Sequence, residues 1–146
     1  MENSNPITPM KLIKLCYIAQ GVYLVARNER LFNDELEAWK YGPVVPSLYH
    51  EFKRFGDKEV TIYGGVHINH QGDVEYPHVL ESDVEALEVL NLVWDQFKDW
   101  TASQLSAWTH RDGSAWQTIK KRRSENQSIS DEMLKTEFEK IIILDK

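Results

Sequence analysis

The chain has 146 residues, a hydrophobic content of 42% and a net charge of −6, which together predict one domain spanning residues 1–146 and argue against disorder. The acidic balance also argues against a nucleic-acid partner, because nucleic-acid-binding proteins cluster Lys and Arg. One cysteine excludes an intramolecular disulfide, and a polar N-terminus without an apolar run of about 18 residues argues against a signal peptide and a membrane partner, so we expect a cytoplasmic protein.

The first predicted element is a long helix. Thr8 followed by Pro9 is typical of an N-cap and the first helical position, and the helix is expected to end near Arg27. Gly21 in its interior costs about 1 kcal/mol relative to Ala, so we expect another backbone to pack closely there. Helical spacing predicts one buried face: Leu12, Cys16, Ala19, Tyr23 and Ala26, with Leu15 and Val22 beside them.

The segment 37–56 combines strand, turn and helix signals. Residues 37–41 are expected to be extended, and Gly42-Pro43 predicts a rigid turn, because Pro fixes its own φ and disfavours helical geometry in the residue before it. Pro46 then predicts a helix start, and Gly56 its end. Three apolar side chains on that helix, Leu48, Phe52 and Phe55, share one face.

Aromatic side chains surround this predicted turn. Trp and Tyr are enriched at interface hot spots, and the turn itself is expected to be exposed. Core packing is the favoured outcome for Trp39, whereas core and surface are about equally favoured for Tyr41. We predict a partner-binding surface formed by Trp39, Tyr41, Gly42, Pro43, Val44, Pro46, Tyr49 and His50.

Short strands are predicted at residues 60–63, 66–70 and 74–76, joined by Gly-rich turns. So small a sheet must pack against helices to be stable. His67 and His70 are three residues apart, so in a strand they would point to opposite faces. We therefore predict no metal site, and no phosphate- or dinucleotide-binding motif suggests a cofactor.

Four helices are predicted in the C-terminal half. Ser82 with Glu85, Thr101 with Gln104 and Ser114 with Gln117 are capping boxes, and Ser130 caps a last helix. The basic run 120–123 is typical of a helix C-terminus. The expected buried side chains are Leu87, Leu90, Trp94, Phe97, Leu105, Trp108, Leu134, Phe138, Ile141 and Ile142. The whole pattern predicts an α+β domain, mostly α-helical, with five or six helices and a small antiparallel sheet or hairpin.

The loop between two capped helices carries His110, Arg111 and Asp112. His and Asp can perform acid–base catalysis, but no nucleophile motif accompanies them. We interpret the loop as one whose side chains satisfy free backbone groups, and we add His110 and Arg111 to the predicted partner-binding residues. An uncharacterised enzyme using His110 and Asp112 is the less favoured alternative.

Three blocks of sequence carry a family resemblance: KLIKLCYIAQGVYL at residues 11–24, LFNDELEAWKYGPVVPSLY at 31–49, and LSAWTHRDGSAW at 105–116. In this order they are similar to the SocA-like antitoxin family, also called the Panacea domain. Ala115 departs from the pattern, since the family commonly has proline there.

This resemblance implies a non-enzymatic, protein-binding antitoxin of a toxin–antitoxin system, of a kind frequent in prophages, that neutralises a cognate toxin by direct binding. A second implication is a proteolytic adaptor that delivers its toxin to the ClpXP protease. The identity of the toxin does not follow from either.

Overall fold

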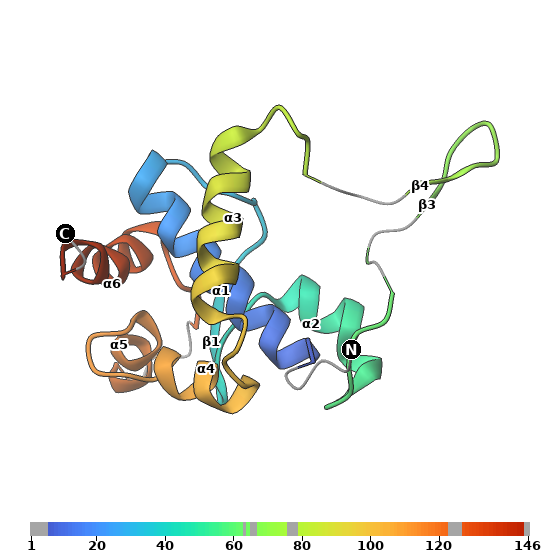
Figure 1. The fold of residues 1–146 in the computed structure, drawn as a ribbon. Coiled ribbons are helices and arrows are strands. Elements are labelled where there is room, and N and C mark those ends of the chain that lie inside the picture. The colour runs from blue at the N-terminus through green and yellow to red at the C-terminus, as the bar shows by residue number, and fades with distance from the viewer. Residues whose placement is uncertain (1–5, 63, 65–66, 76–78, 123–126, 145–146) are drawn as a thin grey trace.

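Helix α1 (Pro9–Arg27) is the central element of the fold in this computed structural model, which describes residues 6–62, 64, 67–75, 79–122 and 127–144. Helices α3 (Val84–Phe97), α4 (Ala102–Thr109) and α6 (Asp131–Leu144) pack around it, as Figure 1 shows. The remaining helical elements are α2 (Pro46–Phe52), the short 3-10 helix η1 (Lys53–Phe55) and α5 (Ala115–Lys121).

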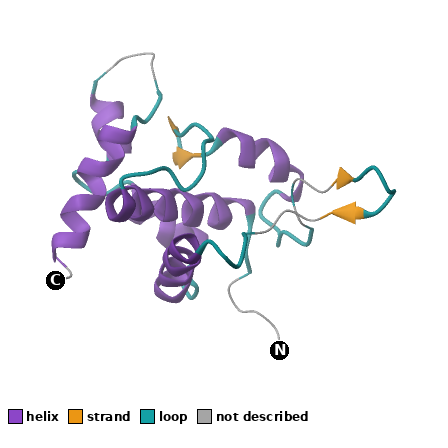
Figure 2. Cartoon of the chain, turned by 90° about the horizontal axis from the view of Figure 1, so that it is seen from above, coloured by secondary structure: helices purple, strands orange, loops and turns teal. Residues whose placement is uncertain are grey.

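Two short antiparallel hairpins complete the described structure. Strand β1 (Glu37–Trp39) pairs with β2 (Gly42–Val44), and β3 (His67–Ile68) pairs with β4 (Val74–Glu75). The β3–β4 hairpin lies away from the helices in both views (Figures 1 and 2). Gln127 to Ile129 run along β1, where the Ala38 amide donates to the Gln127 carbonyl. The predicted class, α+β and mostly helical, is confirmed.

Helix α1 begins and ends as predicted. The Thr8 hydroxyl accepts a hydrogen bond from the Lys11 amide, Pro9 is the first helical residue, and Asn28 ends the helix in a left-handed conformation. The prediction of a single buried face is wrong, because helices on several sides bury almost the whole circumference. Gly21 does allow a close approach, but the group against it is the ring of Phe138 from α6 and not a backbone.

Helix α3 differs from its prediction in its cap and in its buried face. Asp83, not Ser82, accepts the capping hydrogen bond, from the Ala86 amide. Phe97 is buried as predicted, but Leu87 and Leu90 are only half-buried and Trp94 is exposed. The smaller side chains of Ala86, Val89 and Val93 are the buried ones on this helix, which packs against α1.

Other predicted helix starts are confirmed: Pro46 begins α2, Thr101 and Gln104 form a capping box, and Ser114 and Ser130 cap α5 and α6. The predicted strand at residues 60–63 is wrong over 60–62, which form no strand; the Val60 amide instead donates to the Ile7 carbonyl at 2.8 Å. Tyr63, Tyr76 and residues 123–126 lie outside the described residues, as do the side chains of His67 and Ile142.

Candidate partner-binding surface

The β1–β2 hairpin turns at Lys40 and Tyr41, two residues before the predicted position. Gly42 is the first residue of β2 and pairs with Trp39, and Pro43 pairs with Ala38. Gly42 adopts φ +117°, a region that residues with a side chain rarely enter. The Gly-Pro pair therefore makes a close-packed strand instead of an exposed turn.

The hairpin belongs to the second sequence block, and the first and third blocks hold it in place. From α1, the Lys14 ammonium donates to the Pro43 carbonyl at 2.7 Å. From α4, the Ser106 hydroxyl donates to the Tyr41 carbonyl at 3.2 Å, and from α5 the Trp116 indole donates to the Trp39 carbonyl at 2.5 Å. These bonds satisfy backbone carbonyls that a two-stranded hairpin would leave open.

Close packing under the hairpin explains why residue 42 is glycine. A Cβ at this position would come within 2.8 Å of Lys14 Nζ and 3.0 Å of His110 Cε1. His110 therefore packs against the hairpin at Gly42, and its ring also contacts the Trp116 ring at a centroid distance of 4.0 Å.

The predicted partner-binding residues divide by exposure. Gly42, Pro43 and Val44 are buried, so the expectation that the Gly-Pro segment would be exposed is wrong; Trp39, Pro46, His110 and Arg111 are half-buried. Tyr41, Tyr49 and His50 are exposed, and Tyr41 exposes 68% of its surface. We name the accessible set Trp39, Tyr41, Tyr49 and His50 the hairpin surface.

Aromatic contacts order the hairpin surface. Trp39 and Tyr49 meet edge to face with ring centroids 5.2 Å apart, and the Tyr49 and His50 rings are 5.3 Å apart. The Trp39 indole also donates to Glu37 Oε1 at 2.9 Å. Such contacts hold three rings of this surface in defined orientations.

His110 and Asp112 do not form an acid–base pair. His110 Nδ1 lies 2.5 Å from the Ser106 carbonyl and so donates to it, while Asp112 Oδ1 accepts from the side-chain Nε2 of Gln117 at 2.5 Å. His110 satisfies a backbone carbonyl, as the sequence interpretation expected, whereas Asp112 bonds a side chain of the next helix. This arrangement lends no support to a shared catalytic role.

Arg111 belongs to a buried polar cluster that the sequence did not reveal. Its guanidinium lies 2.9 Å from Glu137 Oε2 and 3.7 Å from the centroid of the Trp108 ring. The other Glu137 oxygen accepts from the Tyr17 hydroxyl at 2.5 Å and from the Ala115 amide at 3.0 Å. Burial and the Glu137 carboxylate raise the pKa of Tyr17. This cluster joins α1, α5 and α6.

Three polar side chains of α1 are also buried: Lys11, Lys14 and Gln20. Lys11 donates to the Lys98 carbonyl after α3, and Gln20 bonds the backbone of Leu31 and Phe32. These side chains anchor loops to the central helix. In the sequence, the feature that could have indicated these buried side chains is the pair of lysines, three residues apart, within an otherwise apolar helical segment.

The buried Lys14 is expected to make the free energy of unfolding increase as pH rises in the alkaline range. Burial lowers the pKa of its ammonium to about 8, from 10.5. Between these values the unfolded chain binds more protons, so stability rises with pH through this window and is lost as pH falls through about 8. The pKa difference corresponds to about 3 kcal/mol. It is measured by taking the unfolding free energy of wild type minus that of Lys14→Met, and following how this value changes from neutral to alkaline pH.

Urea denaturation between pH 7 and pH 10.5 tests this expectation. Lys40→Met, at an exposed lysine in the hairpin turn, is the matched control and should give a profile parallel to wild type. Parallel profiles for Lys14→Met and wild type would contradict the argument.

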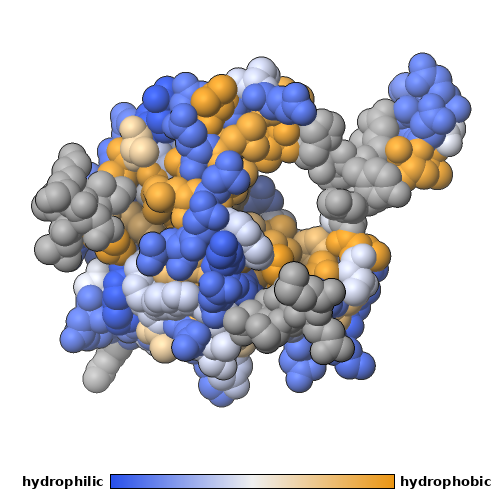
Figure 3. All heavy atoms as spheres, viewed as in Figure 1, coloured by the Kyte–Doolittle hydropathy of each residue, from blue (hydrophilic) through white to orange (hydrophobic). Residues whose placement is uncertain are grey.

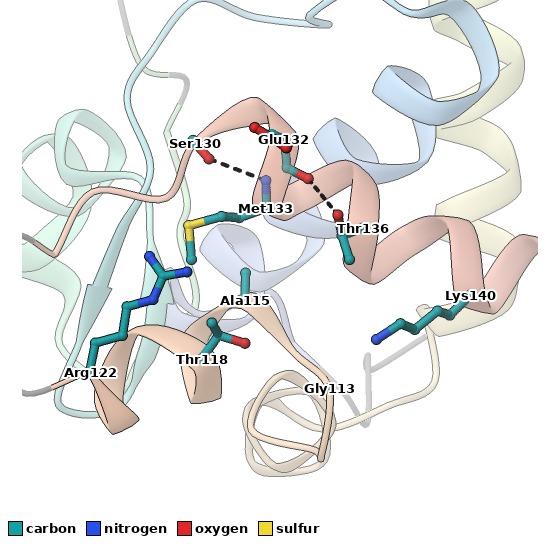
Figure 4. Close-up of a pocket in the computed structure, with 9 residues that line it drawn as sticks. All are labelled: Gly113, Ala115, Thr118, Arg122, Ser130, Glu132, Met133, Thr136 and Lys140. Carbon is teal, nitrogen blue, oxygen red and sulfur yellow. Dashed lines mark hydrogen bonds between the residues drawn. The ribbon is translucent and has the colours of Figure 1, made fainter.

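A cleft of about 410 Å³ lies between α5 and α6 (Figure 4). Its hydroxyl groups serve the backbone: Ser130 accepts from the Met133 amide and Thr136 donates to the Glu132 carbonyl. Arg122 and Lys140 contribute positive charge at its edges. The lining contains no histidine, cysteine or second carboxylate beside Glu132, so we see no catalytic set in this cleft.

The described residues contain neither a candidate metal site nor a helix that could span a membrane. Within the described ranges, no group of three or more His, Cys, Asp or Glu side chains is placed to hold a metal ion. In the same part of the chain, no helix is both long and apolar enough to cross a membrane.

Comparisons with known proteins agree on one family. The family described as "Antitoxin SocA-like, Panacea domain" matches residues 12–117. The curated protein "Antitoxin SocA" of Caulobacter vibrioides is 32% identical over 144 residues, covering 91% of this chain and 72% of that protein. No solved structure matches. The matched residues run from α1 to α5 and include the whole hairpin.

Proposed function

Because the chain belongs to the SocA-like, Panacea-domain antitoxin family, we propose that it neutralises a cognate toxin by binding it directly through the hairpin surface. The toxin is expected to be encoded by a neighbouring gene. Its identity follows from neither the family nor the fold.

The observation that carries the proposal is that the first and third sequence blocks both bond the hairpin formed by the second block. Lys14, Ser106 and Trp116 each bond a hairpin carbonyl. The hairpin then presents an exposed Tyr41 at its turn and the Trp39 ring, which packs against Tyr49. A preorganised surface of this kind loses little conformational entropy on binding. Tyr is also among the residues most enriched at interface hot spots.

Co-expression with the neighbouring gene product tests the proposal. We expect growth of cells carrying the toxin to be rescued, and the two proteins to purify together as one complex. Rescue without a detectable complex and without a fall in toxin level would show that direct binding is wrong.

Proteolytic delivery is the alternative mechanism: the same complex with the toxin forms, but the toxin is then degraded. An adaptor for ClpXP would shorten the half-life of the toxin in cells that contain this protease, whereas direct neutralisation leaves the half-life unchanged. Comparing toxin half-life in cells with and without the protease separates the two mechanisms.

Asp112→Ala is expected to keep toxin neutralisation within a few-fold of wild type. The Asp112 side chain is exposed and bonds Gln117 within its own loop, whereas general acid–base residues typically contribute about 10²–10⁴-fold. A variant that binds toxin normally yet fails to rescue growth would instead favour the enzyme hypothesis. The measurement pairs a binding titration with a growth-rescue assay.

A further inference from the structure

We propose that the cleft between α5 and α6 binds an acidic segment of a partner protein, which lies along the cleft in an extended conformation. Two cations at the edges of the cleft, Arg122 and Lys140, each pair with one carboxylate of that segment. The cleft shares no residue with the hairpin surface, so the proposal does not depend on toxin binding there. Both cations also lie outside residues 12–117, which match the family.

Both cations face the cleft from their own helices. Thr118 and Arg122 are four residues apart at the end of α5 and so lie on one face. Met133 and Lys140 are seven residues apart on α6, which places them in one row along that helix. All four residues line the cleft, and Figure 4 shows Arg122 and Lys140 at opposite ends of it. The positive charges therefore border the cleft itself.

Neither cation has an ion-pair partner among the residues that the structure describes. Asp131, at the start of α6, is paired with Arg30 at 3.0 Å. Glu132 is the one carboxylate in the lining. It lies about 80° around α6 from Lys140, and its side chain is turned away from the interior of the cleft in Figure 4. The charges of Arg122 and Lys140 are therefore available to a partner.

Positive charge is concentrated at this end of an acidic chain. Residues 120–123 are four consecutive cations in a chain with a net charge of −6. Lys120 and Lys121 are exposed on α5, directly before Arg122. Figure 3 shows hydrophilic atoms over the outer side of α5, in contrast to the apolar atoms gathered beside α3. The local charge favours an anionic partner and guides its approach.

The separation of the two cations selects an extended segment. The Lys140 ammonium lies 3.6 Å from the point that a Cβ on Gly113 would occupy, just before α5, whereas Arg122 is the C-cap of that helix. From its N-cap Ser114 to Arg122, α5 rises about 12 Å. An extended chain advances about 3.3 Å per residue and alternates its side chains, so acidic residues at positions i and i+4 span about 13 Å on one side. The residue at i+2 points the same way, towards Ala115, which lies between the cations in Figure 4.

Other anions fit this arrangement less well. A single phosphate ion is too small to reach two cations about 12 Å apart. Nucleic acid carries one phosphate per about 3.4 Å of each strand of a duplex, and a chain with a net charge of −6 repels so long a polyanion. A second copy of this chain, placed face to face, would bring the same cations together. An acidic peptide segment fits both the charges and their spacing.

Fluorescence anisotropy with designed peptides tests the proposal on the full chain. The labelled peptide has about nine residues and contains Glu-x-Leu-x-Glu, where x is Ser or Thr; a matched peptide carries Gln in place of both Glu residues. We expect wild type to bind the glutamate peptide at least about 10-fold more tightly, an effect that added salt weakens. A third peptide with its two Glu residues adjacent has the same charge and should bind more weakly than the first.

Charge reversal in the protein provides the sharper arm. Arg122→Glu with Lys140→Glu should reverse the preference, so that a Lys-x-Leu-x-Lys peptide binds more tightly than the glutamate peptide. Arg54→Glu with Lys58→Glu is the matched control, since both residues are exposed and give the same charge change far from the cleft in the sequence. This control should keep the wild-type preference, and circular dichroism verifies that each variant is folded.

Several results would overturn the proposal. One is equal binding of the glutamate and glutamine peptides by wild type, and another is an equal loss in the Arg54 and Lys58 control. Equal binding of the peptide with adjacent glutamates would contradict the extended fit across both cations. A single-stranded oligonucleotide that binds wild type more tightly than the glutamate peptide, and is lost in the Arg122 and Lys140 variant, would assign the cleft to nucleic acid.

Discussion

Glu137→Leu is expected to lower the free energy of unfolding by about 3–5 kcal/mol. The Glu137 side chain is almost fully buried and accepts hydrogen bonds from the Tyr17 hydroxyl and the Ala115 amide. Leucine can accept neither bond, so two buried donors lose their partner, each at a cost of about 1–3 kcal/mol. The Arg111 guanidinium, 2.9 Å from the carboxylate, loses its counter-charge as well. Urea denaturation at neutral pH measures the change.

Two companion variants isolate the cause. Glu139→Leu, two residues along the same helix and exposed, should change stability by no more than about 0.5 kcal/mol. Glu137→Gln keeps an oxygen acceptor for Tyr17 and Ala115 but removes the charge, so its loss should be smaller than that of leucine. If Glu137→Leu costs no more than Glu139→Leu, the buried cluster contributes little to stability.

The sequence predicted helix starts well because their causes are local. Thr8, Thr101, Ser114 and Ser130 each accept a hydrogen bond from an amide three residues later, and such bonds depend on a few neighbouring residues. The left-handed end of α1 at Asn28 is local in the same sense. Fold class follows from the number and type of such elements.

The packing between helices and the contacts between distant residues were harder to predict. Helix α3 carries apolar residues around much of its circumference, so its sequence alone allowed two buried faces, and the closer packing of Val89 and Val93 on α1 decided between them. The pairing of Tyr17 with Glu137 spans 120 residues. No periodicity in the sequence links two such distant positions.

The hairpin shows the same limit at the candidate site. A Gly-Pro pair is compatible with an exposed turn and also with a strand that another element approaches closely. The second outcome depends on Lys14 and His110, which come from other blocks of the sequence. Binding through the hairpin surface remains a prediction from aromatic composition, now restricted to the residues that are accessible.

Tyr41→Ala is expected to weaken binding of the cognate toxin by about 30-fold or more, which corresponds to about 2 kcal/mol, the range of an interface hot spot. Tyr41 lies at the hairpin turn with 68% of its surface exposed, so truncation removes contact area from the complex without opening a cavity in the free protein. The melting temperature of the free variant should therefore match that of wild type. Isothermal titration calorimetry with purified toxin measures the affinity.

Ile68→Ala is the matched control, because Ile68 is exposed to 70% and lies in the other hairpin. It should bind toxin with wild-type affinity, which separates a specific role of the hairpin surface from a general effect of removing exposed apolar area. An unchanged affinity for Tyr41→Ala, beside a stable complex of wild type with toxin, would move the interface away from the hairpin. That result would overturn the hairpin surface as the binding site, while direct neutralisation of the toxin, which requires only a complex, would stand.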